Sequence, residues 1–516
     1  MKPLKELIKN FKLLHFVLDD ETKSKEQDRN DNEDIIKGDW DGFILLRSIN
    51  EPIAAICFDA REVQKSSLFV AQKGTKTDGH KYINQAIENG AVCIVAERFP
   101  KKIDKNVTYL LVKSSPRSLA LLACNFYDNP SQKLKLIGIT GTNGKTTTAT
   151  MLYHLFTNLG FTCGLISTIE NKIGLTTVPA THTTPDAVQI NQLLSQMVAE
   201  GCQYCFMEVS SHAITQHRID GLHFTGGIFT NITHDHLDYH KTFKAYIAAK
   251  KQFFDNLPKT AFALSNIDDK NGRVMLQNTK ANCKTYSLQT ANCDFKAKIN
   301  ENELDGMNLT IGNENVWFQL VGRFNAYNLL SVYATAILLD IDGKEALQAM
   351  SLLESAAGRF SILRQKEIIV IVDYAHTPDA LLNVLNTIRE VRNNHQKITT
   401  VIGCGGDRDK TKRPQMAKIA FKLSDKLILT SDNPRSEDPN AILNDMLKGI
   451  ENEDDSRVLV NADRKQAIKT AITTAQKSDI VLIAGKGHED YQEINGVKHD
   501  FDDIEIAKQY LLKIKN

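Results

Sequence analysis

The chain has 516 residues, of which 42% are hydrophobic and 24% are charged, and its formal net charge is +1. This length exceeds a single hydrophobic core, so we expect two to four domains of ordinary globular composition. The near-zero charge argues against a nucleic-acid partner, and the chain lacks an apolar run of about 18 residues that would predict a membrane span.

The nine cysteines are scattered along the chain, which favours buried thiols in a reducing cytoplasm. The isolated pair Cys202 and Cys205 opens an apolar run that predicts a strand rather than a zinc site.

The N-terminal part alternates between helix and strand patterns. Apolar residues recur at helical spacing from Leu4 to Leu14, which predicts an amphipathic helix over Met1–Leu18 rather than a signal peptide. The charged segment 19–34 predicts an exposed, mobile loop. A first domain boundary is expected near Pro130. Before it we expect strands at Ile53–Phe58, Ser67–Ala71, Val92–Ala96 and Tyr109–Val112, and helices at Tyr82–Asn89 and Ser118–Phe126.

A phosphate loop follows this boundary. The apolar run that begins at Leu134 predicts a buried strand, and the pattern from Ala149 to Leu159 predicts a helix. Between them lies the core Gly-Thr-Asn-Gly-Lys-Thr, residues 141–146, whose spacing differs from the common G-x-x-x-x-G-K-[ST] motif. Such a strand–loop–helix binds phosphate because backbone N–H groups and the helix N-terminus face the anion, the lysine neutralises it and the threonine hydroxyl can hold Mg²⁺.

Two later strands carry polar residues at their ends. The predicted strand Tyr204–Val209 carries Glu208 and precedes Ser210, and the predicted strand Gly227–Asn231 precedes the histidine-rich segment His234–His240. Ligands of open α/β sheets lie at the carboxyl ends of strands, so we expect one shared Mg²⁺–nucleotide site. Surface histidines in a solvated loop are the alternative for His234–His240.

A third segment starts near Gly358 and repeats this pattern. Arginine, aspartate and glutamate recur at its strand ends, which turn formation alone does not explain, so we expect a second ligand edge carrying both charge signs. Arg408, Arg435, Asp432 and Glu489 would suit a zwitterion. ATP-dependent amide ligation is then one of several possible P-loop chemistries. The expected strands are Ile368–Asp373, Ile398–Gly403, Lys426–Thr430 and Asp479–Ala484.

Taken together, these motifs resemble the Mur ligases of bacterial cell-wall synthesis. Within that family the chain is most similar to the MurE branch, which adds the third peptide residue to UDP-MurNAc-L-Ala-D-Glu. The resemblance runs from about Ile53 to the C-terminus. It rests on the motifs at 141–148, Met207–His212, Asp235–His240, Gly322–Asn325, Asp373–Pro378, Asp432–Arg435 and Gly485–Glu489.

The resemblance implies an α/β fold with three domains. These are a UDP-substrate-binding domain at 1–130, a central P-loop ATPase domain with a mostly parallel sheet at 131–357, and a Rossmann-like amino-acid-binding domain at 358–516. It also implies an ATP-dependent acid–amino-acid ligase, using Mg²⁺ and an acyl phosphate, which works in the cytoplasm as a monomer. The Asp432-Asn433-Pro434-Arg435 sequence resembles enzymes that add meso-diaminopimelate.

Site residues follow from the same resemblance, motif by motif. The catalytic set is Lys145, Glu208, His236 and Lys250, of which Lys250 matches a lysine that is carbamylated in the family. The metal-binding set is Thr146, Glu208, His236 and the Lys250 carbamate. The ATP-binding set is Gly141, Thr142, Asn143, Gly144, Lys145, Thr146, Thr147, Asn325, Asn328, Arg359, Asp373 and His376. The UDP-MurNAc-dipeptide set is Lys76, Thr77, Thr183, Thr184, Ser210, Gln216 and Arg218. The diaminopimelate set is Arg408, Asp432, Asn433, Pro434, Arg435, Gly485 and Glu489.

Several alternatives stay open on the sequence. An L-lysine-adding MurE and a folylpolyglutamate-synthase-like ligase share the phosphate loop, and a non-catalytic nucleotide-dependent scaffold or a P-loop switch or transport ATPase would belong to a different class. The chain also departs from the family at Ala60, where a serine often stands, which puts a hydroxyl contact to the substrate in doubt.

Overall fold

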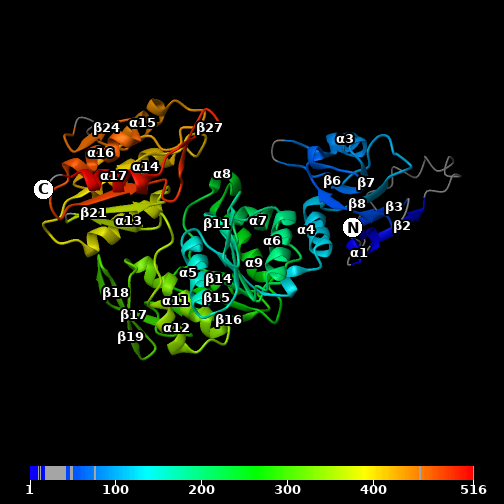
Figure 1. The fold of residues 1–516 in the computed structure, drawn as a ribbon, viewed down its shortest axis with the longest axis horizontal. Coiled ribbons are helices and arrows are strands. Elements are labelled where there is room, and N and C mark those ends of the chain that lie inside the picture. Colours follow the sequence, from blue (N-terminus) through cyan, green and yellow to red (C-terminus); the bar gives the residue numbers. More distant parts are fainter. Residues whose placement is uncertain are drawn as a thin grey trace. The chain divides into compact units, whose positions relative to one another are not determined.

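The computed structural model describes residues 1–9, 11, 13–17, 42–46, 50–74, 77–365, 367–451 and 455–514. The charged segment 19–34, predicted to be a mobile loop, lies outside these ranges. The chain forms two compact units, which we describe separately. Figure 1 shows its helices and strands, coloured along the sequence. The first comprises Met1–Ile137 and Thr162–Thr225, and the second comprises Gly138–Phe161 and Gly226–Asn516.

A six-stranded sheet dominates the N-terminal part of the first unit. Its strand order is β2-β3-β8-β7-β6-β5, and all neighbours run parallel except β3 and β8. Its strands are β2 (Leu13–Val17), β3 (Gly42–Leu46), β5 (Ala55–Cys57), β6 (Ser67–Val70), β7 (Ala91–Ala96) and β8 (Thr108–Val112). Helices α3 (Ile83–Glu88) and α4 (Ser115–Phe126) confirm the two predicted helices.

The predicted N-terminal helix is wrong. Helix α1 spans only Leu4–Leu7, and the later apolar residues form β2, which pairs with β3. Leu4 and Leu7 pack against Leu119 and Leu122 of α4. Apolar residues spaced for a helix can also supply a strand when a neighbouring strand offers backbone hydrogen bonds, so sheet pairing overrides the periodicity here. The predicted strand Ile53–Phe58 is likewise divided, because β4 (Pro52–Ile53) pairs with β1 (Lys2–Pro3), apart from β5.

The second stretch of the first unit, Thr162–Thr225, holds strands in the order β12-β11-β10-β13. Strands β10 and β13 are parallel, and the other pairs are antiparallel. These strands are β10 (Cys163–Ile166), β11 (Glu170–Ile173), β12 (Thr176–Pro179) and β13 (Tyr204–Glu208), and α6 covers Ala187–Ala199. Cys202 and Cys205 are buried free thiols, as predicted.

The second unit begins at the end of β9 (Lys135–Thr140), which leads into α5 (Lys145–Asn158). Further strands of this unit lie side by side in the order β14-β15-β16-β17-β18-β19, parallel up to β17 and antiparallel beyond. These strands are β14 (Gly226–Phe229), β15 (Phe262–Asn266), β16 (Asn282–Ser287), β17 (Phe295–Glu303), β18 (Gly306–Ile311) and β19 (Glu314–Phe318). The same unit contains helices α8 (Leu237–His240), α9 (Phe243–Asp255) and α11 (Arg323–Leu338).

The C-terminal sheet of the second unit has the order β20-β21-β25-β22-β23-β24 and is parallel except between β20 and β21. One face packs against α13, α14 and α15, and the other against α16 and α17, so the sheet is covered on both sides (Figure 1). Strands β21, β22, β23 and β25 confirm the four predicted strands. The bounds are β20 (Ser361–Gln365), β21 (Ile368–Asp373), β22 (Ile398–Ile402), β23 (Lys426–Leu429), β24 (Val458–Val460), β25 (Ile480–Ala484), α13 (Pro378–Val391), α14 (Lys412–Leu423), α15 (Pro439–Leu447), α16 (Arg464–Thr474) and α17 (Asp503–Lys513).

A hairpin of β26 (Tyr491–Ile494) and β27 (Val497–Asp500) follows β25. No helix among the described residues is long and apolar enough to cross a membrane. The predicted boundaries at residues 130 and 357 stay predictions.

Candidate functional site

The phosphate loop connects β9 to α5 through backbone that requires glycine. Gly144 caps the N-terminus of α5 with a φ of +86°, and a Cβ there would approach the Asn328 Oδ1 atom to 2.6 Å. A side chain at this position would therefore both strain the backbone and displace Asn328. The loop is also fixed from β14, because the Thr230 hydroxyl donates to the Asn143 carbonyl at 2.6 Å. The local sequence thus builds the strand–turn–helix that it predicts.

Lys145 and Thr146 begin α5 and lie on this loop. The Lys145 ammonium donates to the carbonyls of Gly141 and Thr142 at 3.0 and 2.9 Å. The Thr146 hydroxyl accepts from Arg359 Nη2 at 3.2 Å. A lysine, an arginine and a helix N-terminus therefore meet at the loop, an arrangement suited to phosphate oxygens.

Lys250 on α9 is brought to the same loop. Its side chain is 1% exposed, and Nζ donates to the Gly141 carbonyl at 2.8 Å and lies 4.8 Å from the centre of the Tyr246 ring. Burial, with repulsion from Lys145, lowers the pKa of Lys250 well below its ordinary value. A lysine with a lowered pKa carries a larger fraction of neutral amine, the form that reacts with CO₂ to give a carbamate.

The histidine-rich segment contributes a buried acid beside a predicted metal ligand. His236 Nε2 lies 3.5 Å from Asp235 Oδ2, and the Lys412 ammonium of α14 donates to Asp235 Oδ1 at 2.8 Å. Burial opposes the charge of Asp235, but His236, Lys412 and His376 outweigh it and hold the pKa of Asp235 below its usual range. Lys412 therefore joins the histidine segment to a helix of the C-terminal sheet.

The predicted nucleotide residues of the C-terminal segment gather around Tyr374. The Arg359 guanidinium lies 4.5 Å from the Tyr374 ring centre, and its buried Nε has no hydrogen-bond partner among the described residues. His376 Nδ1 contacts the Tyr374 carbonyl at 2.9 Å. Asp373 Oδ2 accepts from the Phe360 N–H at 2.7 Å, and burial raises the pKa of Asp373 to about 6 despite the nearby Arg359. On α11, the buried Asn328 donates a hydrogen bond from Nδ2 to Oδ1 of the buried Asn325 at 3.1 Å.

Within the first unit, several predicted dipeptide-binding residues form one network. The Thr184 hydroxyl accepts from the Ser210 N–H at 3.0 Å, and its carbonyl accepts from Arg218 Nη1 at 2.7 Å. Arg218 also donates to Gln216 Oε1, at 2.7 Å from Nη2. Residues 34 positions apart in the chain thus share one hydrogen-bond network, and their part in binding the dipeptide substrate stays a prediction.

Glu208, at the end of β13, is fully buried in the same unit. Its Oε1 accepts from the Thr168 N–H at 2.7 Å, while Oε2 has no hydrogen-bond partner among the described residues. The Thr168 hydroxyl in turn donates to the Thr183 hydroxyl at 3.0 Å. A buried carboxylate oxygen without a partner is costly unless a cation binds it, so this observation fits a Mg²⁺ ligand.

The loop that carries Lys76 and Thr77 of the UDP-MurNAc-dipeptide set is described only in part. Lys76 lies outside the described residues. Thr77 is exposed, and its carbonyl accepts from the Gly74 N–H at 2.8 Å. The described contacts therefore leave the role of this loop a prediction.

The predicted diaminopimelate residues converge where β23 and β25 end. Gly485, with a φ of +117°, lies so close to Asp432 that a Cβ would stand 2.6 Å from Oδ2. Asn433 Nδ2 donates to Glu489 Oε2 at 2.7 Å, and Arg435 Nη1 donates to the Gly406 carbonyl at 2.7 Å. Two further members of the set, Pro434 and the exposed Arg408, flank this edge. Both charge signs are thus present at one sheet edge, as the sequence predicts.

Models of three Mur ligase domains match the chain. The Mur ligase family catalytic domain matches residues 52–127, the Mur ligase middle domain matches 139–336, and the Mur ligase glutamate ligase domain matches 358–487. A protein of Cytophaga hutchinsonii named UDP-N-acetylmuramoyl-L-alanyl-D-glutamate–2,6-diaminopimelate ligase is 56% identical over 461 residues, which cover 89% of this chain and 94% of the relative. The chain belongs to the Mur ligase family.

Other Mur ligases agree with this assignment. A relative of the same name from Bacteroides fragilis is 52% identical over 458 residues, covering 89% of this chain and 94% of the relative. A solved structure of a ligase with that name has a TM-score of 0.65 at 33% identity, covering 90% of this chain and 95% of the other. MurF ligase from Thermotoga maritima, solved in complex with ADP, has a TM-score of 0.59 at 19% identity, covering 89% and 98%, and shows the likeness of fold alone. The three-domain α/β fold predicted from sequence is therefore confirmed.

The sequence analysis missed two residues that contact the predicted site residues of this Mur ligase, Asp379 and Lys412. Asp379 accepts from Asn143 Nδ2 and from the Thr233 hydroxyl, each at 3.0 Å, and burial raises the pKa of Asp379. Asp379 follows the Thr-Pro start of a helix, where a capping or solvent role is the ordinary interpretation, so no local signal marks it.

The described ranges contain no group of three or more histidine, cysteine, aspartate or glutamate side chains arranged to hold a metal ion.

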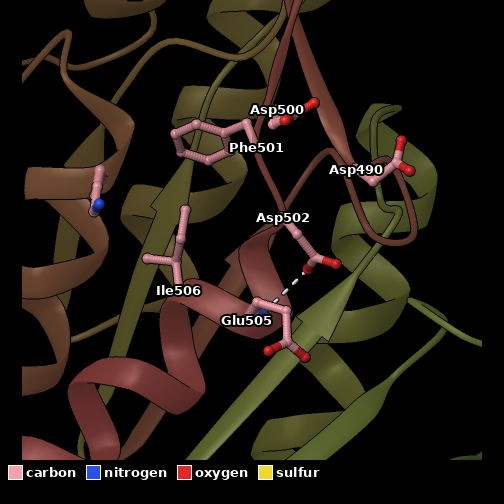
Figure 2. Close-up of a pocket in the computed structure, with 7 residues that line it drawn as sticks. Asp490, Asp500, Phe501, Asp502, Glu505 and Ile506 are labelled. Carbon is pink, nitrogen blue, oxygen red and sulfur yellow. Dashed lines mark hydrogen bonds between the residues drawn. The ribbon is translucent and has the colours of Figure 1, made fainter.

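A separate depression of about 420 Å³ lies on the C-terminal segment (Figure 2). Its lining includes Asp490, Asp500, Asp502 and Glu505, and Asp502 Oδ1 caps α17 by accepting from the Glu505 N–H at 3.1 Å. None of the predicted site residues lines it. Its acids serve as a helix cap and a solvated rim, so we assign the depression no part in the reaction.

Proposed function

We propose that this Mur ligase joins meso-diaminopimelate to UDP-MurNAc-L-Ala-D-Glu with ATP and Mg²⁺, in peptidoglycan precursor synthesis in the cytoplasm, and acts as a monomer. The observation that carries the substrate choice is Arg435 and Glu489 at one edge of the C-terminal sheet. Diaminopimelate has a carboxylate and an ammonium at its far end, where lysine has only an ammonium. The relatives that share 52–56% of their residues with this chain carry the corresponding name.

The reaction would begin at the phosphate loop. A free carboxylate is a poor electrophile because oxide is a poor leaving group, so the terminal glutamate carboxylate first takes the γ-phosphoryl group of ATP. Lys145 and the N-terminus of α5 would neutralise charge on the β- and γ-phosphates, and Arg359 would add a cation from the C-terminal segment. Thr146, Glu208, His236 and carbamylated Lys250 would hold Mg²⁺, which would supply positive charge against the developing charge of phosphoryl transfer.

The second step would form the amide bond. The amine of diaminopimelate attacks the acyl carbonyl, and the tetrahedral intermediate expels phosphate. The protein's part is to hold the amine against the carbonyl, because orientation replaces the entropy lost by a bimolecular encounter. Arg435 and Glu489 would bind the far end of the amino acid, and Thr184, Ser210, Gln216 and Arg218 would bind the dipeptide substrate.

Selectivity against lysine follows from the same arrangement. With lysine bound, Arg435 Nη2 would lose the ligand carboxylate while its other nitrogens keep their protein partners, and a lost hydrogen bond to a charged group costs about 1–3 kcal/mol. This corresponds to a preference for diaminopimelate of about 5- to 140-fold.

The test is phosphate release with ATP, Mg²⁺ and UDP-MurNAc-L-Ala-D-Glu, with meso-diaminopimelate and L-lysine compared as acceptors. Release that depends on diaminopimelate is the expected result. A preference for lysine would contradict the substrate choice and keep the ligase, and activity with dihydropteroate instead would point to a folylpolyglutamate-synthase-like enzyme.

A further inference from the structure

Two charged side chains outside the predicted set, Lys486 and Glu493, contact the proposed diaminopimelate site. Lys486 follows β25, and Glu493 lies in β26 of the hairpin after it. Each one is paired with a residue of opposite charge that the proposed function assigns to the substrate.

Lys486 is a fully buried cation. Its side chain is 0% exposed, and Nζ lies 3.2 Å from Glu489 Oε2 and 3.2 Å from Asn433 Oδ1. The ring centre of Tyr491 lies 5.4 Å from the same atom. A buried ammonium is tolerated only when it is paired and hydrogen-bonded, so these contacts account for its position.

Lys486 also fixes the amide of Asn433. Asn433 Oδ1 accepts from Lys486 Nζ and from the Glu493 N–H at 2.9 Å, so its NH₂ group faces Glu489 Oε2 at 2.7 Å. Oε2 is thereby used twice within the protein. The other oxygen, Oε1, has only a 3.5 Å contact from the Tyr374 hydroxyl among the described residues, which leaves it as the atom for a ligand ammonium.

Glu493 orients the Arg435 guanidinium, as Lys486 orients the Asn433 amide. Glu493 Oε2 lies 3.2 Å from Arg435 Nε, while Arg435 Nη1 donates to the Gly406 carbonyl at 2.7 Å. Arg435 adopts a φ of +53°, and its N–H donates to the Glu493 carbonyl at 3.0 Å. Within the described part of the chain, Nη2 has no hydrogen-bond partner, so it is the group left to meet a ligand carboxylate.

We propose that Lys486 and Glu493 are positioning residues that supply an internal counter-charge to each substrate-binding charge. The inference rests on the proposed function. With these partners, Glu489 and Arg435 stay held apart when no amino acid is bound, instead of neutralising each other. The ammonium and carboxylate at the far end of diaminopimelate then meet oriented groups, which lowers the ordering cost of binding.

Two substrate analogues separate the two halves of this arrangement. L-Lysine lacks the far carboxylate, and 2-aminopimelate lacks the far ammonium. Glu493→Gln should raise the KM for diaminopimelate about tenfold and reduce its advantage over L-lysine, because Arg435 loses its orientation. Lys486→Met should raise the same KM to a similar extent and reduce the advantage over 2-aminopimelate. The KM for ATP should change by less than about twofold in both variants, and Glu493→Asp should recover part of the loss.

Matched controls use exposed ion pairs of the same types. Lys477→Met breaks the surface pair with Glu367, and Glu505→Gln breaks the surface pair with Lys508. Neither should alter analogue selectivity, because exposed pairs contribute little. Thermal melting of every variant accompanies the kinetics, and Glu493, with a side chain 27% exposed, provides the test should Lys486→Met fail to fold.

The outcomes separate this inference from the function on which it rests. A wild-type enzyme that does not use diaminopimelate refutes both. A diaminopimelate-dependent wild type with unchanged selectivity in Glu493→Gln refutes this inference alone. An equal loss for all acceptors and for ATP also refutes it, because that result indicates a purely structural role.

Discussion

Lys250 offers the sharpest test of the catalytic assignments. The residue is 1% exposed, and its amine donates to the Gly141 carbonyl at 2.8 Å, beside the like-charged Lys145. In the absence of carbamylation, a charged Lys250 destabilises the folded protein, by about 1.4 kcal/mol for each pH unit by which its pKa falls below the unfolded value. The sign follows from linkage: a lowered lysine pKa means that the folded state binds fewer protons, so stability rises with pH between the folded and unfolded pKa values.

Replacement by methionine should therefore separate stability from activity. Lys250→Met keeps the buried stem and removes the amine, so we expect an unchanged or higher melting temperature at pH 7. If a carbamate supports Mg²⁺ at the phosphate loop, activity should fall by about 10²–10³-fold, the usual effect of removing one electrostatic contact in an active site. The stability measurement shows that the loss is not a folding defect.

Chemical rescue identifies the missing group. Lys250→Ala should be inactive and partly restored by acetate or formate, whose carboxylate can enter the space left by the side chain. Wild-type enzyme labelled with ¹³C-bicarbonate should show a carbamate carbon signal by NMR that Lys250→Met lacks. Full activity of Lys250→Ala without added acid, together with no carbamate signal in the wild type, would refute the assignment.

Three other predictions follow from the second unit. Lys145→Ala should abolish phosphoryl transfer, measured as ADP formation, and near-normal turnover would exclude its phosphate role. Asp373→Asn should stabilise the ligand-free enzyme at pH 7 by up to about 3 kcal/mol. Burial raises the pKa of Asp373 from 3.8 to about 6, so the wild-type protein loses stability as the pH rises from 4 to 6, and the variant should not. A variant whose melting temperature depends on pH between 4 and 6 as the wild type's does would contradict the burial argument. Arg435→Lys should weaken diaminopimelate use far more than ATP binding, because one ammonium cannot reproduce the separate contacts of the guanidinium to Glu493 and Gly406; equal loss of both would indicate misfolding.

Local sequence was enough to predict the elements that carry the site. The phosphate loop follows from an apolar strand, a glycine-rich turn and a helix, because each part is specified by residues next to it in the chain. The parallel strands β21, β22, β23 and β25 were predicted for the same reason, since buried strands are short apolar runs. The polar motifs at their ends could be expected at one edge because parallel strands share an orientation.

The N-terminus shows where local pattern fails. The spacing from Leu4 to Leu14 fits a helix, yet β2 forms where β3 supplies backbone partners. Strand pairing depends on a segment distant in the chain, which no window of neighbouring residues contains.

Tertiary structure alone decided which charged side chains around the site are paired with each other. Asp235 and Lys412 are 177 positions apart, and Asn433 and Lys486 are 53 apart, so nothing in the sequence near either residue indicates its partner. The sequence by itself determined that this chain carries a phosphate loop and a charged sheet edge. Only folding decided which charge is buried, which is paired and which is left for a ligand, because burial and electrostatic pairing depend on distances in space rather than along the chain.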